Sequence, residues 1–171
     1  SSMNTMLKNN SGFDLKQLFI GTEGVLGFIT RIVFRLQAKP RSHNVALVAC
    51  DDYEQVTALL SACRGQLGSA LCGFEVMWDS YFHTVVKPEG RLPTPVDLSY
   101  RFYVIIEATG TQPGLDDEAF EAAIGEMFDA GYCADGVIAK SEAERDAIWA
   151  IRHEVEWVVR DAHVFDVSLP I

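Results

Sequence analysis

Basic residues are scarce in this sequence: 14 lysines and arginines stand against 24 aspartates and glutamates, which gives a net charge of −10. Proteins that bind nucleic acid or anionic membranes usually carry a basic stripe, and this sequence has none. It also lacks any apolar run near the roughly 20 residues that a membrane helix needs. We therefore expect a globular protein that binds no nucleic acid and has no membrane-spanning segment.

Cysteine is scarce as well, and its spacing is not that of a metal site. Cys50, Cys63, Cys72 and Cys133 form no Cys-x-x-Cys pair, and the histidines also lack ligand spacing, so no metal site is predicted. Each cysteine lies in or beside an apolar stretch. We expect buried free thiols in a reducing compartment, with a disulfide as the alternative. This predicts a cytoplasmic protein, and peripheral membrane association stays open.

One segment, residues 38–42, has the composition of a linker, because it is polar and contains a proline. It divides the chain into two predicted parts, 1–40 and 41–171. In the first part, Asp14 is expected to cap a short helix, and a strand is predicted over 28–37.

Beyond the linker, predicted strands and helices alternate. Glu75, Arg101 and Glu107 lie inside predicted strands, which argues against the fully buried strands of a parallel sheet. The sequence instead predicts an α+β fold, with helices packed on one face of an antiparallel-rich sheet. Strands are expected over 44–50, 71–77, 101–108, 134–139 and 163–169, and helices over about 78–86, 116–130 and 142–161, with one more helix that Asp51 or Asp52 caps.

The most informative segment is glycine-rich: residues 21–30 read Gly-Thr-Glu-Gly-Val-Leu-Gly-Phe-Ile-Thr. Glycine is required where the backbone takes a positive φ or lies directly against a ligand. The segment is not a Rossmann fingerprint, because the strand before it and the helix after it are absent. A tight turn before an edge strand is the alternative.

A longer run that includes this segment carries a family resemblance. Residues 7–30 read Leu-Lys-Asn-Asn-Ser-Gly-Phe-Asp-Leu-Lys-Gln-Leu-Phe-Ile-Gly-Thr-Glu-Gly-Val-Leu-Gly-Phe-Ile-Thr. This resembles the end of the FAD-binding domain in the vanillyl-alcohol-oxidase superfamily, in the branch of D-lactate, glycolate and D-2-hydroxyglutarate dehydrogenases. Phe13, Val25 and Phe28 depart from the usual pattern. The resemblance continues more weakly through residues 74–78, 148–152 and 166–170.

The resemblance implies a flavoprotein oxidoreductase of which this chain is a fragment. Residues 1–40 would end the FAD-binding domain, and residues 41–171 would be the N-terminal part of a ferredoxin-like substrate-binding domain. Arg152 would hold the substrate carboxylate. FAD would lie along the backbone of Glu23, Gly24, Val25, Leu26, Gly27, Phe28 and Ile29.

Further expectations follow from the same resemblance. The parent would oxidise a D-2-hydroxy acid by hydride transfer to flavin, whereas the fragment alone would be inactive. Family members bind a divalent metal and hold a catalytic base in a histidine motif that this chain lacks, so both are expected beyond Ile171. A homodimer is expected, and the electron acceptor is not specified.

Several alternatives stay open at this stage. Arg152 could be an ordinary helix arginine paired with Glu144, Asp146 or Glu156. The family often has a lysine where this chain has Val164, next to His163, which puts a standard D-2-hydroxyglutarate specificity in question. Nothing in the sequence places Glu75 and Glu107 together as an acid/base pair. The alternative function is a non-catalytic α+β ligand-binding or interaction domain, and a third hypothesis is a flavin enzyme for an aryl alcohol or ether-lipid precursor.

Overall fold

The computed structural model describes residues 6, 8, 10, 12–86 and 92–155 of the 171-residue chain. It divides into two compact units, Ser1–Lys39 and Pro40–Ile171. The assignment of residues 1–40 to an FAD-binding domain and of 41–171 to a substrate domain stays a prediction.

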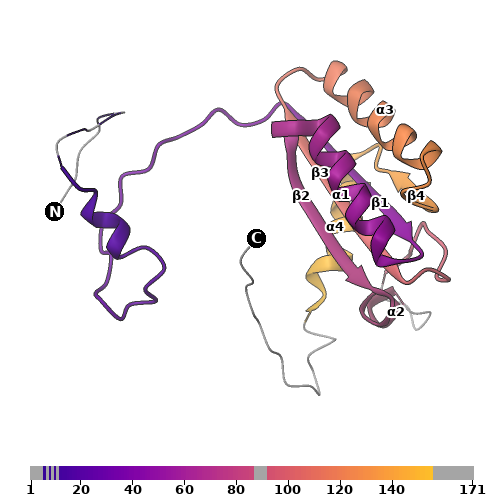
Figure 1. The fold of residues 1–171 in the computed structure, drawn as a ribbon, viewed down its shortest axis with the longest axis horizontal. Helices are drawn as coiled ribbons and strands as arrows, with labels where there is room; N and C mark the ends of the chain where they lie inside the picture. The colour runs from indigo at the N-terminus through magenta and orange to yellow at the C-terminus, as the bar shows by residue number, and fades with distance from the viewer. Residues whose placement is uncertain (1–5, 7, 9, 11, 87–91, 156–171) are drawn as a thin grey trace. The chain divides into compact units, whose positions relative to one another are not determined.

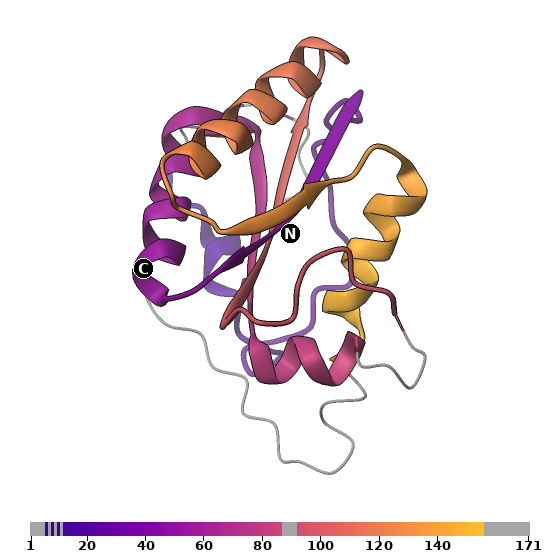
Figure 2. The ribbon, with the colours of Figure 1, turned by 90° about the vertical axis from the view of Figure 1, so that its right-hand side faces the viewer.

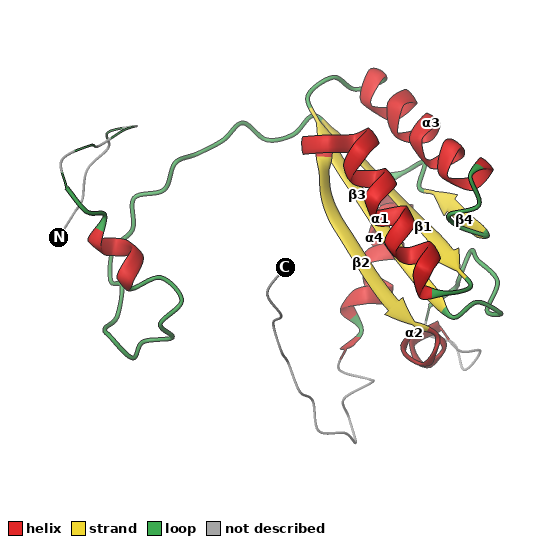
Figure 3. Ribbon diagram, viewed as in Figure 1, coloured by secondary structure: helices red, strands yellow, loops and turns green. Residues whose placement is uncertain are grey.

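The second unit is built on a four-stranded antiparallel sheet (Figures 1 and 3). Its strands are β1 (Ser42–Cys50), β2 (Leu71–Trp78), β3 (Phe102–Gly110) and β4 (Asp135–Ile138), in the order β2-β3-β1-β4. This is the split arrangement of a ferredoxin-like fold, in which each crossover helix connects two strands that are not neighbours. The predicted α+β class is confirmed, whereas the predicted strand 163–169 lies outside the described residues.

Helices cover both faces of the sheet. Crossover helices α1 (Tyr53–Leu67) and α3 (Leu115–Asp129) pack on one face, as predicted, and α2 (Asp79–Val86) and α4 (Glu142–His153) form a second layer on the other (Figure 2). The cause lies in β1, where every residue from Val45 to Cys50 is apolar and fully buried. Successive side chains of a strand point to opposite faces, so a strand that is apolar throughout needs cover on both.

Local capping begins the helices near the predicted positions. The Asp52 carboxylate accepts a hydrogen bond from the Gln55 N–H at 2.8 Å, which caps α1. At α4, the Ser141 hydroxyl accepts from the Glu144 N–H at 3.2 Å. The Glu144 carboxylate accepts from the Lys140 N–H at 2.6 Å, one residue before the N-cap, so a reciprocal capping box is only half formed.

The first unit differs from the prediction. A short 3-10 helix, η1 (Leu15–Leu18), follows Asp14, but the Asp14 side chain makes no capping hydrogen bond. The strand predicted over 28–37 is wrong, because that segment has no strand assignment. A strand needs a neighbour to pair its N–H and C=O groups, and none of the described residues supplies one. Of the described residues in 1–39, none is buried.

Within the described residues, no helix has both the length and the apolar character needed to cross a bilayer.

Candidate functional site

Arg152 lies in the last turn of α4, above the edge of the sheet formed by β2. Its Nε donates a hydrogen bond to Oε2 of Glu75 on β2 at 2.9 Å, and the two side chains are 38% and 41% exposed. The hydrogen bond to Glu75 raises the pKa of Arg152 and outweighs the opposing effect of burial, so the guanidinium stays a cation. Within the described residues the ion pair is with Glu75 and not with Glu144 or Asp146.

Tyr81 holds the backbone of the same turn. Its hydroxyl lies 2.9 Å from the carbonyl oxygens of both Ile151 and Arg152. A hydroxyl has one proton, so Tyr81 shares it between two C-terminal carbonyls that have no partner inside the helix. Burial raises the pKa of the Tyr81 phenol, with Arg152 opposing that shift. No local sequence signal connects α2 to the end of α4, so this contact could not be predicted from the sequence.

A second ion pair lies on the same face of the sheet. Glu107 on β3 pairs with His43 on β1. In the register of β2 and β3, Glu107 stands opposite Gly73, and Glu75 stands opposite Ile105. The sequence does not predict that Glu75 and Glu107 lie close together. The strand register nevertheless places them on adjacent strands, two positions apart along the strand direction. Each carboxylate already has a hydrogen-bond partner, Arg152 for Glu75 and His43 for Glu107, so the arrangement does not favour an acid/base pair.

Trp149 covers this part of the sheet. Its ring lies over Gly73, where an added Cβ would be 3.5 Å from the ring and 3.0 Å from Cβ of Glu107. The same ring stacks on His153, with centroids 5.6 Å apart and planes 23° apart. The absence of a side chain at residue 73 thus lets α4 approach β2 closely, and it brings Arg152 within reach of Glu75.

The bond to Glu75 uses only one edge of the guanidinium. In the part of the chain that the structure describes, no hydrogen bond to Nη1 or Nη2 of Arg152 is observed, but the nearby Tyr81 hydroxyl also interacts with the guanidinium and helps to raise the pKa of Arg152. Nη1 and Nη2 form a planar fork that matches the two oxygens of a carboxylate, and a guanidinium does not deprotonate in a protein. The geometry therefore suits an anion receptor. The departures from the family pattern at His163 and Val164 lie outside the described residues.

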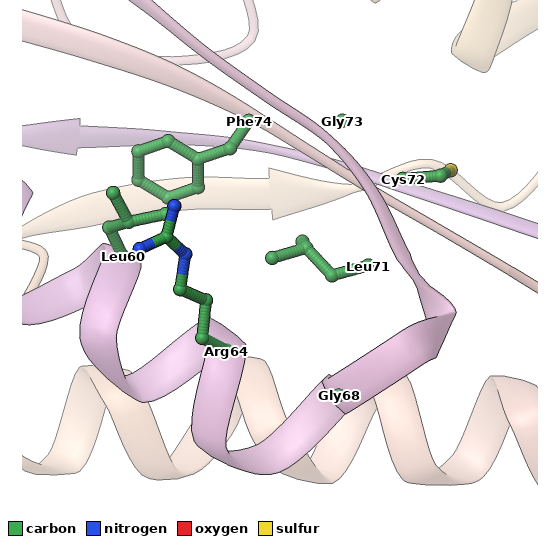
Figure 4. A pocket seen from close by; sticks show the side chains of 7 residues that line it. All are labelled: Leu60, Arg64, Gly68, Leu71, Cys72, Gly73 and Phe74. Atoms are coloured by element: carbon green, nitrogen blue, oxygen red, sulfur yellow. The ribbon is translucent and has the colours of Figure 1, made fainter. Parts of the chain in front are cut away.

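A hollow of about 340 Å³ lies elsewhere, between α1 and β2 on the face that α1 covers (Figure 4). Arg64 extends into it from α1 toward Phe74, and Cys72 lies at its far end. Arg152 lies on the opposite side of the sheet, so the hollow is separate from the candidate anion site. The sequence assigned no function to this region.

The glycine-rich segment has the backbone that its composition predicts. Gly21, Gly24 and Gly27 have φ values of 79°, 85° and 151°, and Glu23 also has a positive φ of 49°. The Val25 N–H closes a turn on the carbonyl of Thr22 at 2.9 Å. Only glycine adopts such angles readily, so the turn depends on its three glycines.

The surface of this segment fits a flat ligand with polar edges. The side chains of Val25 and Phe28 are 84% and 90% exposed. The backbone N–H groups of residues 26–29 donate to no acceptor among the described residues. Unpaired N–H groups beside open apolar side chains are what an isoalloxazine ring could use, so the residues present are compatible with the expected flavin.

The cysteines are free thiols in two environments. Cys50, Cys63 and Cys133 are buried as predicted, and burial raises the pKa of each thiol to about 12. Cys72 is exposed, so its predicted burial is wrong: it lies at an irregularity in the pairing of β2, at the edge of the sheet. Within the described residues, no group of three or more potential ligands could hold a metal ion.

Comparison with known proteins gives a family and several relatives. A family model described as FAD linked oxidases, C-terminal domain, matches residues 39–171. The chain is 36% identical over 172 residues to D-2-hydroxyglutarate dehydrogenase, mitochondrial, of Rattus norvegicus. The aligned residues make up 99% of this chain and 32% of the relative. A probable D-2-hydroxyglutarate dehydrogenase, mitochondrial, of Oryza sativa subsp. indica is 38% identical over 173 residues. These residues make up 99% of this chain and 31% of the relative.

A third relative is named for a different activity. D-2-hydroxyglutarate–pyruvate transhydrogenase of Saccharomyces cerevisiae is 32% identical over 174 residues, or 100% of this chain and 35% of the relative. The chain thus spans about a third of the length of the curated relatives it matches.

Proposed function

This chain belongs to the family of FAD linked oxidases, C-terminal domain, and on that premise we propose that it is part of an FAD-dependent dehydrogenase that oxidises a D-2-hydroxy acid to the 2-oxo acid. The resemblance inferred from the sequence is confirmed at the level of the family. Family membership does not favour the alternative of a non-catalytic interaction domain.

The observation that carries the proposal is the guanidinium of Arg152, which Glu75 holds at Nε. A 2-hydroxy acid presents a carboxylate next to the carbon that is oxidised, so a bidentate contact to that carboxylate orients the carbon as well. Arg152 offers the two terminal nitrogens for this contact while Glu75 occupies Nε. In the proposed enzyme Arg152 binds and orients the substrate, and it transfers no proton, because its pKa is raised further by Glu75.

Residues Glu23 to Ile29 are proposed to hold part of the flavin. FAD, when bound, supplies the acceptor for the hydride that leaves the substrate carbon. The contribution of this chain is a strip of unpaired N–H groups and exposed apolar side chains, as at Val25 and Phe28. Such a strip can lie along an isoalloxazine edge and exclude water from it.

The names of the relatives also bear on the compartment and the substrate. Several relatives are named mitochondrial, which does not fit the cytoplasmic expectation well. We propose a small-molecule 2-hydroxy-acid substrate, in line with the names of the relatives. The homodimer stays a prediction that rests on the family resemblance alone, as does the metal bound by residues beyond Ile171.

The test uses the full-length protein that contains this chain. Anaerobic addition of D-2-hydroxyglutarate or D-lactate should bleach the visible absorbance of its flavin at a rate on the order of the kcat values of ordinary enzymes, about 1–10³ s⁻¹. The L-enantiomers serve as the control. A flavoprotein that none of a panel of D-2-hydroxy acids reduces would contradict the proposal, as would a full-length protein without flavin.

A further inference from the structure

Arg152 is held at two points by two different elements. Glu75 on β2 accepts from its Nε at 2.9 Å, and Tyr81 on α2 donates to its backbone carbonyl at 2.9 Å. Arginine has many rotamers, and a guanidinium tethered only at its Cα samples many directions. The two contacts remove much of that freedom, one at the backbone and one at the head group.

The position of the Glu75 contact determines which edge of the guanidinium is presented. The guanidinium is planar, and a hydrogen bond at Nε constrains its orientation about the last side-chain bonds. The edge formed by Nη1 and Nη2 points away from this bond, and the Tyr81 hydroxyl is a further neighbour of the guanidinium. Glu75 itself is held in place by the register of β2, where it stands opposite Ile105.

We propose that Glu75 is a positioning residue for substrate binding: it orients the guanidinium of Arg152 so that the two terminal nitrogens face the substrate carboxylate. The inference rests on the proposed function, because it assigns Glu75 a role in the same site. Glu75 touches neither substrate nor the reacting atoms, and it acts through Arg152.

A purely structural role is the competing explanation, and the exposure of the pair separates the two. Both side chains are more than a third exposed, and ion pairs of this kind contribute little to stability. Loss of Glu75 should therefore leave the unfolding temperature nearly unchanged while it alters substrate affinity. A structural role would move both together.

The experiment is a double-mutant cycle in the full-length enzyme, with D-2-hydroxyglutarate and D-lactate as substrates and a dye acceptor. Glu75→Ala should lower kcat/KM by about tenfold to a hundredfold, the effect of a misplaced binding group. Glu75→Gln keeps an oxygen that accepts from Nε, so it should stay within a few-fold of wild type. Affinity for 2-oxoglutarate, measured by calorimetry, should fall in parallel with kcat/KM and gives a readout that does not depend on turnover.

The Arg152→Ala background tests whether Glu75 acts through Arg152. If it does, adding Glu75→Ala to Arg152→Ala should change kcat/KM by less than about twofold, since contacting residues are not additive. Glu121→Ala is the matched control, because it removes another exposed carboxylate paired with a cation, Lys140, on a different part of the surface. It should have no effect on kcat/KM.

The outcomes separate this inference from the proposed function. If Arg152→Ala lowers kcat/KM and Glu75→Ala does not, Glu75 has no positioning role but the proposed function stands. Equal losses from Glu75→Ala in the wild-type and Arg152→Ala backgrounds would also overturn the inference. If Arg152→Ala has no effect, the assignment of the substrate site itself is wrong.

Discussion

Gly73 of β2 and Glu107 of β3 stand opposite each other so closely that a Cβ on Gly73 would lie 3.0 Å from Cβ of Glu107. The ring of Trp149 closes the same space from the helix side, 3.5 Å from that position. The close contact between α4 and the sheet therefore depends on a residue without a side chain. Because Trp149 and Arg152 lie on one turn of α4, the position of the candidate anion site depends on it too.

Gly73→Ala should destabilise the chain by about 1–3 kcal/mol, the typical effect of an extra methyl group in a packed site. The added carbon would push Glu107 or Trp149 away, whereas the backbone conformation would tolerate alanine. Gly125→Ala in α3 is the control: nothing lies within 4 Å of its added Cβ, and it should stabilise the helix by about 0.5–1 kcal/mol. Denaturant unfolding of the 171-residue chain measures both, and equal effects would contradict the packing argument.

Arg152→Ala in the full-length enzyme should lower kcat/KM. The loss should correspond to about 2–4 kcal/mol of transition-state stabilisation, the scale for loss of a bidentate charged contact. Arg152→Lys should recover only part of it, because an ammonium has no planar fork. Stability should change by less than about 1 kcal/mol, since the ion pair with Glu75 is half exposed. Steady-state kinetics on D-2-hydroxy acids measures the effect, with Arg64→Ala as a helix arginine control on the other face of the sheet.

The 171-residue chain by itself should not retain FAD. Residues 23–29 offer one exposed strip of backbone, and so few contacts do not offset the entropy lost on binding. The absorbance spectrum of the purified chain checks this, with the full-length protein as the positive control. A near-stoichiometric flavin spectrum from the chain alone would show that the strip binds far more strongly than its exposure indicates.

Only one thiol should react in the native chain. Cys72 is exposed, whereas burial raises the pKa of Cys50, Cys63 and Cys133 to about 12. Titration with a chromogenic disulfide near pH 8 should modify about one thiol per chain before unfolding and four afterwards, because a buried neutral thiol is inert. Cys72→Ser should abolish the native reaction. Rapid labelling of two or more thiols in the native chain would contradict the buried positions.

The three buried thiols make the free energy of unfolding depend on pH in the alkaline range. Their pKa is raised in the folded chain above the value of about 8.5 in the unfolded chain, so the folded state holds protons that the unfolded state releases. Their contribution is fully present below about pH 8.5 and should be lost as the pH rises toward 12. Replacement of Cys63 by alanine should weaken this dependence, and unfolding curves at pH 7 and pH 10 would measure it.

The sequence by itself determined what depends on neighbours along the chain. Asp52 caps α1 because its carboxylate needs only the N–H three residues later. The apolar run from Val45 to Cys50 predicts a strand, and the structure buries every residue of that run. The run from residue 7 to 30 identified the family because it preserves a specific order of residues.

The tertiary structure alone decided what depends on residues far apart in sequence. Arg152 and Glu75 meet across 77 positions, and Tyr81 reaches Arg152 across 71, so no local pattern could pair them. The strand predicted over 28–37 has the right composition, but no neighbour among the described residues pairs with it. Local propensity determines which helices and strands can form, whereas register and packing determine which side chains meet, because those contacts exist only after distant segments have come together.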